Sequence, residues 1–254
     1  GQYLLNEKED LKVKVVIGKN QEISRLIADE FIKQIRRKPT SVLGLATGTS
    51  PLEVYANLIK ANKERVISFK KVTTYNLDEY VGLDGSHNQS YRYFMNASLF
   101  DHIDIDKNNT HVLKGVGDYL DYAAHYDEEI ARSGGIDLQI LGLGSDGHIA
   151  FNEPDTSFDS LTHIADLTES TIRDNSRLFK DISEVPTKAV TMGLKSIMNA
   201  KKIVLIATGK NKAKAVKDLL EGPISEKVPC SILQKHSDCT IYVDADAYSK
   251  VNQK

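Results

Sequence analysis

The sequence predicts an α/β fold in three layers: an open, mostly parallel, Rossmann-like sheet covered by helices on both faces. Short β-rich runs alternate with segments of helical period almost from end to end. Several of these runs end in a glycine turn that leads into a helix, as in βα units of a parallel sheet. Because the chain has no internal repeat, low-complexity tract or long linker, residues 13–250 are expected to form one domain, preceded by an extension of unknown role, residues 1–12.

The first half of the chain predicts three strands and four helices. Residues 21–37 give the clearest helical pattern, because Ile23, Ile27 and Phe31 recur on one side of an amphipathic helix. The strands are assigned to the short β-rich runs between helical segments. In chain order the predicted elements are strand 13–17, helix 21–37, strand 42–46, a helix from Pro51, strand 72–77, and helices 90–99 and 118–132.

The second half continues the alternation. Its longest apolar runs precede glycine turns, which is typical of strands that deliver polar groups to the edge of a parallel sheet. The predicted elements are strand 136–143, helix 168–179, a strand-like run 189–192, strand 203–208, helix 212–220 and a last strand 239–243.

Composition excludes several classes of function. A net charge of -2 gives no electrostatic reason to expect binding to nucleic acid or to an anionic membrane, and no apolar stretch approaches the ~18 residues of a membrane span. Cys230 and Cys239 fit neither a C-x-x-C motif nor a disulfide framework, so a reducing cytoplasm is expected. The seven histidines are scattered, so no metal site is expected.

Residues 141–154, Leu-Gly-Leu-Gly-Ser-Asp-Gly-His-Ile-Ala-Phe-Asn-Glu-Pro, form the most informative motif. An apolar run ends in glycines, and Asp146, His148 and Glu153 then follow within eight residues. In an extended segment Asp146 and His148 would share a face, where a carboxylate fixes the tautomer of an imidazole and raises its basicity. A histidine that merely caps a turn is the alternative, but the glycines and the second carboxylate favour a proton-transfer group.

The segment after strand 42–46 has the composition of an anion site. It reads Thr47-Gly48-Thr49-Ser50-Pro51, in which Ser50 is expected to be the N-cap and Pro51 the first helical residue. Free backbone N–H groups at the glycine, the hydroxyls and the positive helix end together suit a phosphate. Such turns also occur for purely structural reasons, and the spacing is not that of a nucleotide-binding P-loop.

Two carboxylates, Asp78 and Glu79, follow strand 72–77. Burial would raise the pKa of such a group and suit it to act as a general base. A solvated acidic turn explains the same two residues equally well.

Cations follow strand 203–208 and occur on the predicted helix 168–179. A lysine after Gly209 would hold a phosphate as a point charge, but spacing does not choose among Lys210, Lys212 and Lys214. Arg177 is a further candidate, although a single helical arginine is usually solvated.

Taken together, these strand ends predict one site, because ligands of an open parallel sheet bind beyond the carboxyl ends of its strands. No G-x-S-x-G nucleophile elbow is present, and a G-x-G-x-x-G turn after the first strand is missing, so NAD is not expected. The residues predict proton-transfer chemistry on a small phosphorylated substrate without a metal or an organic cofactor.

From residue 13 onward, the chain resembles the glucosamine-6-phosphate deaminase family. The related 6-phosphogluconolactonases share the fold and a G-x-D-G-H core, but the continuation over 149–154 is similar to the deaminases. The matching segments are LATGTSP (45–51), YNLDEYVGL (75–83), LGLGSDGHIAFNEP (141–154), NSRLF (175–179) and TGKNKAKAV (208–216).

This resemblance implies conversion of glucosamine 6-phosphate and water to fructose 6-phosphate and ammonia, in amino-sugar catabolism. His148 would open the sugar ring by moving a proton between the anomeric hydroxyl and the ring oxygen, with Asp146 and Glu153 orienting and tuning the imidazole. Asp78 matches the base that takes the proton from C2 and delivers one to C1. A lid over 162–186 would close on the sugar. The phosphate ligands implied are Thr47, Gly48, Thr49, Ser50, Arg177 and Lys212.

The chain also departs from part of the family. Members activated by N-acetylglucosamine 6-phosphate carry a basic pair shortly after the N-E-P segment, where this chain has His163 and Ala165. It also ends soon after Val243, without their longer tail. We therefore expect no such activation, and a monomer or small homo-oligomer rather than a hexamer.

Two other interpretations remain open. A lactonase or a pentose-phosphate isomerase would have the same fold, but residues 149–154 do not match those enzymes. A non-catalytic sugar-phosphate sensor would keep the phosphate loop, and it could lose Asp78 or His148, whereas this chain has both.

Overall fold

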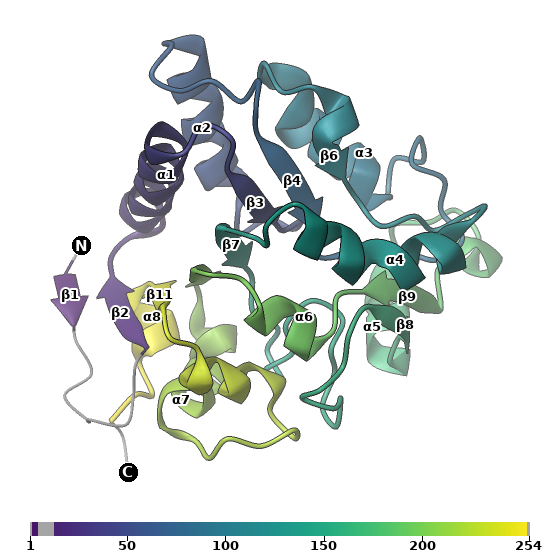
Figure 1. Ribbon diagram of the computed structural model, residues 1–254. Coiled ribbons are helices and arrows are strands. Elements are labelled where there is room, and N and C mark those ends of the chain that lie inside the picture. Colours follow the sequence, from purple (N-terminus) through teal and green to yellow (C-terminus); the bar gives the residue numbers. More distant parts are fainter. Residues whose placement is uncertain (1, 5–12, 253–254) are drawn as a thin grey trace.

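A single twisted sheet forms the centre of the computed structural model, which describes residues 2–4 and 13–252 (Figure 1). All neighbouring strands pair in parallel except β1, which lies antiparallel to β2 at one edge. This arrangement confirms the predicted fold class. In spatial order the strands are β1 (Gln2–Leu4), β2 (Lys14–Ile17), β11 (Cys239–Val243), β10 (Ile203–Ala207), β7 (Leu138–Leu141), β3 (Val42–Leu45), β4 (Thr73–Asn76) and β6 (Thr110–His111).

The strand order reverses between β3 and β7. From β3 the chain adds β4 and β6 on one side, and from β7 it adds β10 and β11 on the other. Connections therefore leave these two neighbouring strands in opposite directions, which opens a crevice at their carboxyl ends. The sequence-predicted strand ends follow β3, β4, β7 and β10, which are consecutive in the sheet.

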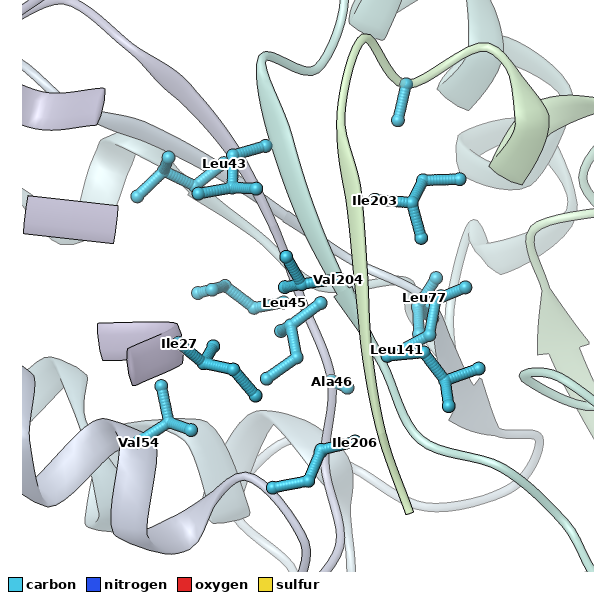
Figure 2. Close-up of a cluster of buried hydrophobic side chains, with 14 of the residues drawn as sticks. Ile27, Leu43, Leu45, Ala46, Val54, Leu77, Leu141, Ile203, Val204 and Ile206 are labelled. Carbon is cyan, nitrogen blue, oxygen red and sulfur yellow. The ribbon is translucent and has the colours of Figure 1, made fainter. Parts of the chain in front are cut away.

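Helices cover both faces of the sheet (Figure 1). On one face, Ile27 of α1 and Val54 of α2 pack against Leu43 and Leu45, whereas Ile203 points to the opposite face (Figure 2). On that second face, the Tyr126 ring of α4 meets Tyr75 edge-on at 5.6 Å between centroids. The helices are α1 (Asn20–Arg37), α2 (Leu52–Lys63), α3 (Tyr91–Ser98), α4 (Tyr119–Arg132), α5 (Glu169–Ser176), α6 (Leu194–Met198), α7 (Ala213–Glu221) and α8 (Ala245–Tyr248), with 3-10 turns η1 (Phe100–His102), η2 (Lys107–Asn109), η3 (Ile182–Glu184), η4 (Lys210–Lys212) and η5 (Pro229–Lys235).

Over the described residues, none of the helices combines the length and the apolar character needed to cross a lipid bilayer.

A second, antiparallel sheet contains β5 (Asp78–Tyr80), β9 (Lys188–Thr191) and β8 (His163–Asp166), in that order. Here the expectation for 189–192 was wrong in part: the strand exists, but it does not belong to the parallel sheet. The β-rich composition of a short run predicts a strand and leaves its partner undetermined, because pairing depends on residues far away in the chain. Asp78–Tyr80, which was expected to form a loop, is the partner of β9.

Most expected helix boundaries differ from the observed ones by a residue, and two of the differences bear on the candidate site residues. The helix after Ser50 begins at Leu52 with Pro51 as its N-cap residue, because a turn from the Thr49 carbonyl to the Leu52 N–H (3.2 Å) precedes it. The helix predicted over 168–179 ends at Ser176, which leaves Arg177 at its C-cap.

Candidate active site

A cavity of about 390 Å³ lies at the carboxyl ends of β3, β4, β7 and β10. All four strand ends singled out in the sequence contribute to its walls, so the prediction that they meet at one place is confirmed. The lining residues are Ala46, Thr47, Gly48, Thr49, Ser50, Leu77, Asp78, Tyr91, Gly142, Leu143, Gly144, Ser145, His148, Ala150, Phe151 and Lys212.

The loop from Thr47 to Ser50 forms the side of the cavity beside α2. Gly48 has φ +98°, a conformation in which glycine avoids the strain of a side chain. The buried Tyr55 hydroxyl fixes the start of the loop, because it donates to the Ala46 carbonyl and accepts from the Ala46 N–H at 3.0 Å. The loop therefore presents backbone and hydroxyl groups beside the N-terminus of a helix, which is an arrangement that suits a phosphate.

Lys212 is the lysine that the structure selects from the three candidates. It lines the cavity, and burial lowers the pKa of its ammonium group. Lys210 is exposed, and Lys214 is exposed and paired with Asp218 at 3.0 Å. The position of Lys212 between β10 and α7 thus distinguishes it from Lys210 and Lys214, which the residue spacing alone did not.

Arg177 is the one predicted phosphate ligand that lies outside the cavity lining. It is exposed, and it follows α5 directly. The structure therefore brings together the loop 47–50 and Lys212, and it leaves Arg177 apart from them.

Asp78 lies at the start of β5, opposite Thr191 of β9, and lines the cavity. Its side chain is only 8% exposed. Burial, followed by the negative charge of Glu79, raises the pKa of Asp78 to about 8, while the nearby His148 acts in the opposite direction. A carboxyl group of this kind is poised to exchange a proton near neutral pH.

Glu79, the other carboxylate after strand 72–77, points away from the cavity. Its Oε1 accepts hydrogen bonds from the N–H groups of Tyr80 (2.9 Å) and Tyr91 (2.8 Å), and its Oε2 accepts one from Arg92 (3.0 Å). Burial raises its pKa to about 7. Alternation along β5 separates the two carboxylates, so Glu79 anchors α3 to the strand that carries Asp78.

His148 is held by the two carboxylates of the motif 141–154. Its Nδ1 lies 2.7 Å from Asp146 Oδ1 and 3.7 Å from Glu153 Oε2. We expected Asp146 and His148 to meet because they would share a face of an extended segment. That reason was wrong, because the segment forms a tight turn. The Gly147 N–H donates to the Gly144 carbonyl at 3.0 Å, and Gly147 has φ +87°.

Gly144 provides the space for the imidazole. A Cβ atom at this position would lie 2.1 Å from His148 Cε1, so a side chain there is incompatible with the observed ring position. Ala150, which also lines the cavity, has φ +52° and keeps the next part of the loop tightly curved. The loop therefore fixes the imidazole through its backbone as well as through the carboxylates.

The ionisations of the three side chains are linked. Burial lowers the pKa of His148, but the hydrogen bond with Asp146 and the charges of Glu153 and Asp146 outweigh it, and the net shift is upward. The interaction with His148 holds the pKa of Asp146 well below its usual range. Burial, together with Asp146, raises the pKa of Glu153 to about 7. The group thus holds exchangeable protons near neutral pH.

The same three residues place one ligand atom each within 4.8 Å of one another, as a metal site would. Nδ1 of His148 is engaged by Asp146, which leaves Nε2 as the ring nitrogen that is free to exchange a proton with a ligand.

Tyr91 and Phe151 line the cavity but were not among the site residues predicted from the sequence. Their rings stack with centroids 6.1 Å apart and 5° between planes, and both line the cavity. Tyr91 follows the N-cap Ser90 at the start of α3. It reaches the cavity because the N-terminus of α3 packs beside β5, and a contact between two separate elements cannot be predicted from the local sequence.

Comparison with known proteins places this geometry among sugar-phosphate enzymes. Residues 19–242 match the model of the family described as glucosamine-6-phosphate isomerases/6-phosphogluconolactonase. Glucosamine-6-phosphate deaminase of Mycoplasma mycoides subsp. mycoides is 52% identical over 237 residues, which cover 93% of this chain and 96% of that protein. The enzyme of the same name from Thermoanaerobacter pseudethanolicus is 52% identical over 241 residues, covering 94% and 95%.

Solved structures of related enzymes have the same fold as this chain. A monomeric glucosamine-6-phosphate deaminase superposes with a TM-score of 0.88 at 42% identity, over 94% of this chain and 99% of that one. The 6-phosphogluconolactonase of Thermotoga maritima has a TM-score of 0.73 at 20% identity, over 91% and 98%, and shares the fold.

Proposed function

Because the chain belongs to the glucosamine-6-phosphate isomerase/6-phosphogluconolactonase family, we propose that it converts glucosamine 6-phosphate and water to fructose 6-phosphate and ammonia. The observation that carries this proposal is that two separate proton-transfer residues, Asp78 and His148, line the same cavity. An aldose–ketose isomerisation that begins with a closed sugar ring requires both. The relatives at about 50% identity carry the corresponding name.

The phosphate of the substrate is bound at the end of the cavity formed by residues 47–50. The N–H groups and hydroxyls of this loop donate to its oxygens, the α2 N-terminus favours the negative charge, and Lys212 supplies a cation. Arg177 reaches the phosphate only if α5 moves toward the cavity, in keeping with a lid over 162–186.

Ring opening is the task of His148. Its imidazole moves a proton from the anomeric hydroxyl to the ring oxygen, so that the C1–O5 bond breaks and a C1 aldehyde forms. Asp146 fixes the ring orientation through the 2.7 Å contact with Nδ1, and Glu153 adds negative charge that favours the imidazolium.

Isomerisation and deamination are the task of Asp78. The carboxylate takes the proton from C2, giving an enolamine, and a proton is then delivered to C1. Water adds at C2, and ammonia leaves to give the 2-ketose. Asp78 must be ionised to accept the first proton, and the ammonium group on C2 of the bound substrate lowers its pKa from the raised value of the free enzyme.

The test is an assay for both products, ammonia and fructose 6-phosphate, from glucosamine 6-phosphate. Asp78→Asn is expected to lose almost all turnover and to keep sugar-phosphate binding. Asp159→Asn, which changes a solvent-exposed aspartate, serves as the matched control. No ammonia from the wild-type protein, or undiminished ammonia from Asp78→Asn, would refute the proposal.

We also propose that the enzyme is a monomer or small homo-oligomer working in the cytoplasm. A monomeric relative at 42% identity supports the first part, together with His163 and Ala165 in place of a basic pair. Two buried free cysteines, Cys230 and Cys239, support a reducing compartment. Light scattering would contradict the first part if it gave the mass of a hexamer.

A further inference from the structure

A second apolar cluster, separate from the main core, lies beside the cavity. Ile172 and Phe179, from α5 and the segment that follows it, pack against its buried members. The steps proposed above do not explain why α5 is attached at this place. The buried members are Tyr80, Leu83, Phe151, Leu167 and Ala189.

Tyr80 is the centre of this cluster. Its ring lies 4.8 Å from that of Tyr91 and 5.7 Å from that of Phe151, between centroids. These two residues line the cavity, so Tyr80 supports that wall from behind. Tyr80 and Asp78 are two apart on the three-residue strand β5, which places their side chains on the same side of the strand.

The Tyr80 hydroxyl is bound to α5. Asn175 Nδ2 donates to it at 3.1 Å, across the boundary between β5 and the helix. Tyr80 is 8% exposed, so this polar contact is made largely out of water. Arg177 follows Asn175 by two residues, at the C-cap of α5.

We propose that Tyr80 is a positioning residue that couples the location of α5, and with it Arg177, to the strand that carries Asp78. The proposal rests on the proposed function, which assigns Arg177 to the phosphate and Asp78 to C2. When α5 moves to bring Arg177 to the cavity, Asn175 either pulls the Tyr80 hydroxyl with it or releases it. In both cases the contacts behind Tyr91 and Phe151 change, so capture of the phosphate alters the wall beside the base.

A double-mutant cycle between Tyr80→Phe and Arg177→Ala tests the coupling. The phenylalanine keeps the ring and removes only the hydroxyl. We expect Tyr80→Phe to lower kcat/KM for glucosamine 6-phosphate about 10-fold in the wild-type background, a typical size for coupling between sites, and less than about 2-fold when Arg177 is already alanine. Equal effects in both backgrounds, or no effect in either, would overturn the proposal.

Two further variants separate coupling from a general loss of structure. Tyr93→Phe removes a tyrosine hydroxyl from the same helix as Tyr91 at a position that is 44% exposed, and it is expected to leave kcat/KM unchanged. The Tyr80 hydroxyl also interacts with the side chain of Tyr91, so Asn175→Ala is expected to reproduce part of the effect of Tyr80→Phe and to add nothing to it in the double variant. Additive losses would contradict a role through this hydrogen bond.

Hydrogen–deuterium exchange with fructose 6-phosphate gives a result that does not depend on turnover. In the wild-type protein we expect peptides from β5 and from α5 to change protection together, and in Tyr80→Phe only α5 to respond. A β5 response that is the same in both proteins, or missing from both, would overturn the coupling. Failure of the proposed function would appear separately, as wild-type protein that gives this exchange pattern but releases no ammonia.

Discussion

The buried carboxyl group of Asp78 makes a prediction about stability as well as activity. Its pKa in the folded protein is raised to about 8 from an ordinary value of 3.8, first by burial and then by the charge of Glu79. Ionisation is therefore easier in the unfolded chain. The free energy of unfolding is therefore highest below about pH 4, where the group is protonated in the folded protein and largely protonated in the unfolded chain. It decreases as the pH rises toward 8, by up to about 1.4 kcal/mol per pH unit.

Asp78→Asn keeps the shape of the side chain and removes the ionisation. The variant and the wild type should differ by less than about 1 kcal/mol in unfolding free energy at pH 4, because the carboxyl group is neutral in the folded protein and only about half ionised in the unfolded chain. At pH 8 the variant should be more stable by several kcal/mol, with about 5 kcal/mol as the upper limit from the shift in pKa. Turnover should fall by at least ~10²–10⁴-fold, because a positioned general base is lost.

Urea unfolding followed by circular dichroism at pH 4, 6 and 8 measures this difference. Glu153 titrates in both proteins, so its contribution largely cancels in the comparison, whereas the interaction between Glu79 and Asp78 is part of the measured difference. Asp159→Asn is the control, because it removes a carboxylate from the surface. A difference that stays constant with pH, or a variant less stable than the wild type at pH 8, would refute the reasoning.

Three further predictions concern catalysis. The rising limb of the pH profile of kcat/KM should have its midpoint near the free-enzyme pKa of Asp78, about 8. The midpoint for kcat should lie at a lower pH, because the substrate ammonium favours the ionised carboxylate. Coincident midpoints would contradict this. Lys212→Ala should raise KM for glucosamine 6-phosphate at least ~10-fold, whereas Lys214→Ala, at a side chain 74% exposed, should change it less than ~2-fold, and equal effects would count against the assignment. Gly144→Ala should displace the His148 ring and lower kcat ~10²-fold with an unchanged circular dichroism spectrum, and full activity would show that the ring position is not required.

The parallel sheet and the four strand ends were predictable from the sequence. Apolar runs that end at glycines occur once per βα unit, and the polar residues that follow are brought together because parallel strands end at one edge. The prediction worked for the loop 47–50, for Asp78 and for His148 because each depends on its own strand.

The remaining features depend on contacts between distant parts of the chain. The spacing of the residues left Asp78 and Glu79 equivalent, and the family resemblance alone singled out Asp78. In the structure, the pairing of β5 with β9 directs Asp78 to the cavity and Glu79 to the N-terminus of α3. Spacing alone also left Lys210, Lys212 and Lys214 equivalent, whereas the resemblance named Lys212, which lies in the cavity lining. The position of Arg177 depends on how α5 packs against Tyr80, which involves two segments far apart in sequence.

The pairing of Asp78 with Thr191 places the catalytic base on a contact between distant parts of the chain, which has a consequence for folding. Strands β3 and β4 are neighbours in both sequence and space, so closing the chain between them costs little entropy. The strand that carries the base, β5, pairs with β9 from the other half of the chain. The loop between β5 and β9 is long and therefore closes more slowly. By this argument β3 and β4 pair before Asp78 is positioned, and a folding intermediate in which only these two strands are paired would still be inactive.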